Sequence, residues 1–118
     1  MHFCSHIVKG PDCVATLDDL VDHIAYVVDL IGVDHVGIGG DYFPVDEAYT
    51  TAQQQFTEVA RAGGKEGRTD QIAFVQGLER ISHLPRLTEH LQRRGFSDDD
   101  IRKIIGGNWL RVYQQVLG

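Results

Sequence analysis

The sequence is poor in cysteine and has no long apolar run. Its two cysteines, Cys4 and Cys13, cannot form a disulfide framework, so we expect free thiols in a reducing compartment. No apolar stretch approaches the ~20 residues that cross a bilayer. The first residues have neither the basic region nor the apolar region of a secretory signal peptide. These absences predict a cytoplasmic protein without a membrane-spanning segment.

Basic residues are also scarce, with 11 Lys and Arg against 17 Asp and Glu and a formal net charge of −6. A sequence-independent nucleic-acid binder needs clustered Lys and Arg, so no nucleic-acid partner is expected. The one dense basic pair, Arg93-Arg94, precedes Gly95 near a predicted helix end, where it complements the helix dipole.

The length of 118 residues fits a single domain over residues 1–118. Hydrophobic residues make up 42% and charged residues 24%, which favours a folded globular chain over a disordered one. A complete (β/α)8 barrel is excluded, because it needs about 250 residues.

Residues 1–41 have the pattern of a strand, a helix and a second strand. The first eight residues alternate loosely and stop at a turn, which predicts a short strand. Thr16 and Asp19 have the spacing of a capping box, and the helical periodicity that follows them ends at Gly32. The apolar run at residues 33–39 predicts the second strand. This order predicts a βαβ unit, and hence an α/β fold with two parallel strands plus several helices.

The rest of the chain divides into a middle segment, residues 42–76, and a helical part, residues 77–118. In the middle segment we expect an inserted loop with a helix at residues 47–62, where Ala, Gln, Glu and Thr dominate. The helical part is predicted from apolar spacing and capping residues. Its helices are residues 84–94 ended by Gly95, residues 98–105 opened by Ser97 and closed by Gly106-Gly107, and a last helix capped by Asn108.

The sharpest local motif is Val36-Gly37-Ile38-Gly39-Gly40-Asp41. A strand that ends in glycines and one carboxylate presents that carboxylate at the edge where parallel α/β folds bind ligands. The spacing is not the dinucleotide-binding fingerprint, so nucleotide binding is not expected. Asp41 is either a functional carboxylate or the cap of a turn or of the next helix, and the residues alone leave both open.

Three residues near the start, His2, Cys4 and His6, would share one face of a strand. Imidazole and thiolate suit zinc, but same-face neighbours lie about 6.6 to 7 Å apart and rarely converge on one ion. A polar lining of a barrel or cleft is the alternative, and no metal ligand is assigned. Of the other histidines, we expect His23 to be packed or half-exposed in its helix. We expect His83 and His90 to lie on the surface.

Two groups of residues carry a resemblance to a known family. The first group is Asp22-His23-Ile24 followed by the glycine-rich motif that ends at Asp41. The second is Gly77-Leu78-Glu79-Arg80-Ile81-Ser82-His83-Leu84-Pro85-Arg86-Leu87-Thr88, then Arg94-Gly95-Phe96-Ser97, then Ile104-Ile105-Gly106-Gly107-Asn108-Trp109-Leu110-Arg111-Val112. In this order they resemble the C-terminal part of the membrane (renal) dipeptidases. The resemblance is weakest over residues 43–76.

The resemblance implies a (β/α)8 barrel hydrolase that carries two zinc ions and cleaves dipeptides. This chain would be its C-terminal portion, with the first strand as the seventh and residues 33–39 as the eighth. Asp41 would stand beside the metal centre and pass a proton between the activated water and the leaving amine. Its neighbour Tyr42 is a candidate substrate-binding residue.

The sequence also departs from the family. The zinc-ligating His-x-Asp pair, the bridging glutamate, two later histidines and the substrate-binding arginine all belong to earlier strands. After the glycines the family commonly has Asp-x-Asp-Gly, whereas this chain has Asp41-Tyr42-Phe43-Pro44 and then an insertion that could form a lid or specificity loop.

We therefore expect the isolated chain to bind no zinc stably, to be inactive, and to self-associate or to pair with an upstream barrel portion. The alternatives are a non-catalytic binding or assembly module and an enzyme for other amide bonds.

Overall fold

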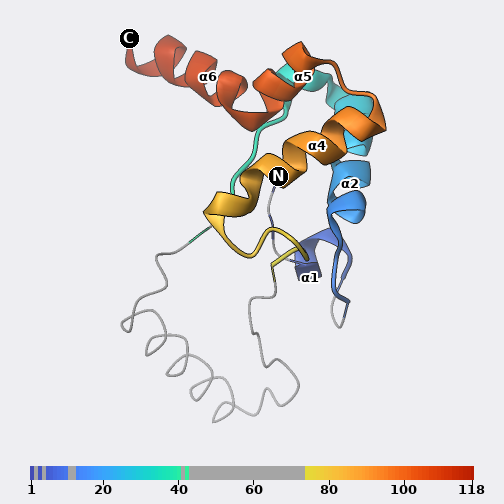
Figure 1. The fold of residues 1–118 in the computed structure, drawn as a ribbon. Helices are drawn as coiled ribbons and strands as arrows, with labels where there is room; N and C mark the ends of the chain where they lie inside the picture. Colours follow the sequence, from blue (N-terminus) through green and yellow to red (C-terminus); the bar gives the residue numbers. More distant parts are fainter. Residues whose placement is uncertain (2, 4, 11–12, 41, 43–73) are drawn as a thin grey trace, which may run out of the picture.

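The computed structural model describes all residues except 2, 4, 11–12, 41 and 43–73 (Figure 1). Within the described part the chain is helical, and its β-structure is limited to isolated bridges. None of the helices described there is both long and apolar enough to cross a membrane. The elements are α1 (Ser5–Val8), α2 (Leu17–Ile31), the 3-10 helices η1 (Val33–His35) and η2 (Ile81–His83), α4 (Leu84–Arg94), α5 (Asp98–Arg102), the π-helix η3 (Lys103–Gly107) and α6 (Asn108–Leu117).

Helix α2 has the boundaries that the sequence predicts. Thr16 Oγ1 accepts a hydrogen bond from Asp19 N at 3.2 Å, and Asp19 Oδ2 accepts one from Thr16 N at 2.8 Å. The capping box is therefore complete, and it satisfies backbone donors that a helix N-terminus leaves free. The helix ends at Gly32, whose φ of 84° favours glycine.

The predicted first strand is wrong from Ser5 onward, because Ser5–Val8 forms α1. Lys9 N donates to Ser5 O at 2.9 Å, and Ser5 Oγ donates to Phe74 O at 2.9 Å. Short apolar runs fit a strand or a helix equally well by pattern. In the structure, Ser5 at the start of this helical turn bonds to Phe74, which lies 69 positions away. A pattern in the local sequence cannot predict such a contact.

The predicted second strand is replaced at its start by η1, and only the residues after it make bonds of the β type. Met1 N donates to Gly37 O, and Gly39 N donates to Met1 O at 2.8 Å. Met1 thus bonds to the residues on both sides of Ile38, which is the hydrogen-bond pattern of two parallel strands. A parallel bridge also joins Thr16 and Gln76. The parallel direction is thus present without a continuous strand.

The C-terminal helices follow the prediction as far as α5. Helix α4 ends at Gly95 in the left-handed conformation with φ 98°, and Ser97 Oγ accepts from Asp100 N at 3.2 Å. The predicted break at Gly106-Gly107 is wrong, because η3 continues the helical backbone into α6. Asn108 does not cap a helix; its side chain is buried and turns to η1 instead.

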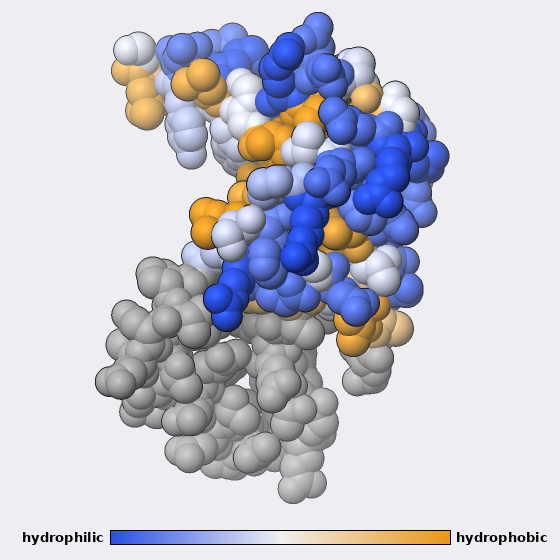
Figure 2. Space-filling view, in the orientation of Figure 1, coloured by the Kyte–Doolittle hydropathy of each residue, from blue (hydrophilic) through white to orange (hydrophobic). Residues whose placement is uncertain are grey.

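The core is formed by residues of α2, α4, α5 and η3, and it is completed by Phe3, Val75 and Leu78. Helices α2 and α4 lie side by side in Figure 1. Helix α6 leaves this core and carries its apolar side chains into solvent, so hydrophobic surface appears at its end in Figure 2. The exposed large apolar residues of α6 are Trp109, Leu110, Val112, Tyr113, Val116 and Leu117.

Candidate functional site

The residues that the sequence singles out for chemistry fall partly outside the described chain. Asp41, His2 and Cys4 lie outside it, and nothing described bears on the side chain of His6. The chain neighbours of Asp41, Gly40 and Tyr42, are described. The candidate site can therefore be built from the backbone on both sides of Asp41.

Tyr42 is held on several sides. Its hydroxyl donates a hydrogen bond to Leu78 O at 2.7 Å. Its ring stacks on Phe74 with centroids 5.2 Å apart and meets Phe3 edge-on at 5.8 Å. Burial raises the pKa of the Tyr42 hydroxyl to about 12, and the nearby charge of Glu79 adds to this. Tyr42 therefore remains a neutral donor at physiological pH.

The glycines of the motif make room for two aromatic rings. A Cβ at Gly37 would stand 2.7 Å from Trp109 Nε1, and a Cβ at Gly40 would stand 2.7 Å from Tyr42 Cε2. Both distances are shorter than ordinary Cβ contacts, so any other residue at these positions would have to displace the ring of Trp109 or of Tyr42. The close ring contacts explain Gly37 and Gly40, which the sequence suggested only as a means of turning the backbone.

Side chains from α6 hold the segment that leads to the glycines. Asn108 Nδ2 donates to Val36 O at 2.8 Å and to Val33 O at 2.7 Å. Trp109 Nε1 donates to Ile38 O at 2.8 Å. Asn108 and Trp109 thus donate to the carbonyls of Val36 and Ile38, two positions apart. Without these bonds the two carbonyls would be unpaired acceptors at the edge of a β segment.

Sequence reasoning missed these roles of Asn108 and Trp109. Both residues belong to the motif Gly106-Gly107-Asn108-Trp109, which in the sequence indicates only the family and the start of a helix. Their partners lie more than 70 positions away, and periodicity does not report such contacts.

A tight turn follows Leu78 and lies next to the Tyr42 hydroxyl. Gly77 N donates to Glu79 Oε1 at 2.7 Å, and His83 Nδ1 lies 3.2 Å from Glu79 Oε2. Hydrogen bonds from the backbone lower the pKa of Glu79, followed by the contact with His83. Glu79 is thus an ionised carboxylate used within its own turn.

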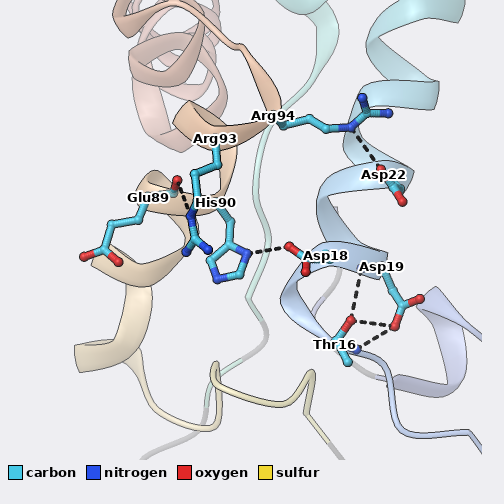
Figure 3. Close-up of polar contacts among 8 residues, drawn as sticks. All are labelled: Thr16, Asp18, Asp19, Asp22, Glu89, His90, Arg93 and Arg94. Carbon is cyan, nitrogen blue, oxygen red and sulfur yellow. Dashed lines mark hydrogen bonds and ion pairs between the residues drawn. The ribbon is translucent and has the colours of Figure 1, made fainter.

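The other predicted histidines have structural surroundings. His23 is half-buried in α2 as expected, and its Nδ1 has no hydrogen-bond partner among the described residues. The side chain of His83 is 27% exposed. His90 is less exposed than predicted, at 18%, because its Nδ1 lies 2.7 Å from Asp18 Oδ1 between α4 and α2 (Figure 3). Across the described ranges no three His, Cys, Asp or Glu side chains come together to hold a metal ion.

A pocket of about 200 Å³ lies beside residues 34–37 and α6. Its lining reaches the first glycine of the motif, Gly37, and does not include Gly39 or Gly40. Three of its polar side chains are engaged with backbone, since Asn108 and Trp109 make the bonds given above and Arg111 donates to Asp34 O at 2.6 Å. A fourth, Asp34, pairs with Lys103 at 2.7 Å. This pocket is therefore not the candidate active site.

The described site consists of a glycine-rich segment held by side chains of α6 and, after Asp41, by the contacts of Tyr42. The family model for the membrane dipeptidases (peptidase family M19) matches residues 1–72 and 66–117. The chain therefore belongs to the membrane dipeptidase family.

Individual relatives agree with this assignment. The chain is 37% identical over 108 residues to Dipeptidase ataJ of Aspergillus terreus, which covers 92% of this chain and 20% of that protein. It is 36% identical over 102 residues to Dipeptidase aclJ of Aspergillus oryzae, covering 86% of this chain and 18% of that protein. A crystal structure of an amidohydrolase from Pseudomonas aeruginosa matches with a TM-score of 0.71 and 28% identity, over 94% of this chain and 33% of that one. The chain thus spans about a fifth of the curated relatives and a third of the solved structure.

Proposed function

We propose that this chain is the C-terminal portion of a (β/α)8 barrel and that the complete protein hydrolyses dipeptides with the help of zinc. The observation that carries the proposal is the family match over nearly the whole chain, together with relatives named as dipeptidases. The parallel contact of Met1 with residues 37–39, with α2 as the crossover between them, is consistent with two neighbouring units of such a barrel.

In this proposal Asp41 is the catalytic residue that this chain contributes. It follows the glycines at the carboxyl end of the segment, which is where barrel enzymes carry their chemistry. As a general acid–base group it would take a proton from the attacking water and deliver it to the leaving amine.

The metal ligands would come from parts of the protein beyond this chain. In the ranges described, no three His, Cys, Asp or Glu side chains come together as a metal-binding cluster. When bound, zinc would supply an activated water and polarise the scissile carbonyl. The contribution of this chain would be the proton transfer and the backbone that supports it.

A non-catalytic binding or assembly role is the second candidate. It is favoured by the exposed apolar residues of α6, since a helix with such a face normally packs against another surface. The two functions are separated by one measurement on the full-length polypeptide that contains this chain. Release of free amino acids from a dipeptide panel with zinc, abolished by a chelator, would establish the peptidase. Complete inactivity of a folded, zinc-loaded protein would favour the binding module.

A further inference from the structure

The Tyr42 side chain is a fixed point in the chain immediately after Asp41. Its hydroxyl bond ends on Leu78, which is fully buried and whose own N–H donates to Val75 O at 2.9 Å. Its ring is packed between Phe3 and Phe74 and covers Gly40. The partner of the hydroxyl is therefore part of the core, and the ring has little room to move.

A second fixed point lies three residues before Asp41. Trp109 donates to Ile38 O at 2.8 Å, and its ring lies against Gly37. Only Gly39 and Gly40 separate this point from Asp41, and glycine restrains the backbone less than any other residue. Gly39 is held by its own bond to Met1 O at 2.8 Å, and the fixed point after Asp41 adds a restraint on the other side.

The Tyr42 hydroxyl is also engaged in a way that argues against direct substrate binding. Its single proton is donated to Leu78 O, so it has none to offer to a ligand in the same arrangement. One face of the ring is stacked on Phe74, and the ring also lies close to Gly40. The Tyr42 side chain thus makes its contacts within the chain, and its hydroxyl proton is not available to a substrate.

We propose that Tyr42 is a positioning residue, which ties the chain directly after Asp41 to the turn at Leu78. This inference rests on the proposed function, because it assigns a purpose to a tether beside a catalytic carboxylate. Small displacements of a reacting group cost large factors in rate, so a single hydrogen bond can matter here without touching the substrate.

The test compares Tyr42→Phe with Tyr26→Phe in the full-length polypeptide. Both changes remove one hydroxyl, but Tyr26 is 62% exposed on α2 and far from the glycines in the chain. We expect Tyr42→Phe to lower kcat for a dipeptide about tenfold with KM within about twofold, the size of effect that loss of one hydrogen bond allows. Tyr26→Phe should leave both constants unchanged. A raised KM at normal kcat would make Tyr42 a substrate-binding residue and overturn the inference, as would unchanged kinetics.

A second readout does not need activity. Amide hydrogen exchange at Gly39, Gly40 and Leu78 should accelerate about tenfold in Tyr42→Phe and stay at the wild-type rate in Tyr26→Phe. If the wild-type protein hydrolyses no dipeptide, the proposed function fails, and the tether is still judged by exchange. Equal exchange rates in the two variants would refute the tether whatever the activity.

Discussion

Arg94 bonds to Asp22 across the same 72 positions that separate His90 from Asp18 (Figure 3). Arg94 Nε lies 3.0 Å from Asp22 Oδ1, one helical turn beyond the contact of His90 with Asp18. Because both pairs advance together, α2 and α4 run in the same direction. Parallel neighbouring helices are what consecutive βα units produce.

The charged pairs show how α2 and α4 are aligned, but they contribute little to the stability of the chain. Asp22 and Arg94 are 67% and 53% exposed, so Arg94→Ala should cost less than about 1 kcal/mol in the free energy of unfolding. Leu91 in the same helix is fully buried, and Leu91→Ala should cost about 2 to 5 kcal/mol. Urea unfolding of the two variants checks this, and similar losses in both would contradict the placement of the core between these helices.

The Tyr42 hydroxyl should make stability depend on alkaline pH. Its pKa is about 12 in the folded chain against an ordinary value of 10.0, because burial favours the neutral phenol. A group with a raised folded pKa stabilises fully below its unfolded pKa, and the benefit is lost as pH rises from about 10 to 12. The stability difference between wild type and Tyr42→Phe should therefore shrink over that window. Denaturant unfolding at several pH values measures it, and a constant difference would contradict a buried, neutral hydroxyl.

The sequence predicts the helices better than it predicts the links between them. Local signals define α2 and α4 correctly, because the Thr16–Asp19 box and Gly95 act within one turn of the backbone. They fail for Ser5–Val8, where Ser5 Oγ bonds to Phe74 O at a distance of 69 positions, and for Gly106-Gly107, where the backbone stays helical.

The candidate site shows the same limit. The motif that ends at Asp41 is found from its glycines, but the reason for Gly37 is the ring of Trp109, 72 positions later. No pattern in one sequence pairs a glycine with the ring that covers it. The glycines locate the motif in the sequence, whereas only the structure shows the side chains that support it.

Asn108 should be among the least replaceable polar residues of the chain. Its side-chain amide donates hydrogen bonds to the carbonyls of both Val33 and Val36. Asn108→Ala would leave both acceptors without this donor and should cost about 2 to 3 kcal/mol. Gln114→Ala, on the exposed part of α6, should cost close to nothing and serves as the control. Thermal melts of both variants decide, and a harmless Asn108→Ala would show that α6 is held by its other contacts.

The isolated chain should self-associate through α6. Leu110 and Leu117 are 59% and 78% exposed, and no apolar side chain of α6 is among the buried core residues. Burying such side chains against a second copy is favourable by roughly 1.5 to 3 kcal/mol for each one fully buried. Light scattering after size exclusion should find dimers or larger species at tens of micromolar. Leu110→Glu with Leu117→Glu should restore a monomer, while Gln114→Glu with Gln115→Glu should not; a monomeric wild type would contradict this.

Asp41 should be needed for turnover and dispensable for folding. In the full-length polypeptide, Asp41→Asn keeps the size of the side chain but removes the acid–base group, so turnover should fall by about 10² to 10⁴. The melting temperature should change little if the carboxylate serves chemistry. If Asp41 instead caps a turn, the same variant should lose roughly 1 kcal/mol of stability and keep near-normal turnover. Steady-state kinetics and a melt on this one variant separate the two roles. Unimpaired turnover with a lowered melting temperature would remove Asp41 from the catalytic machinery, and with it the chemical role proposed for this chain.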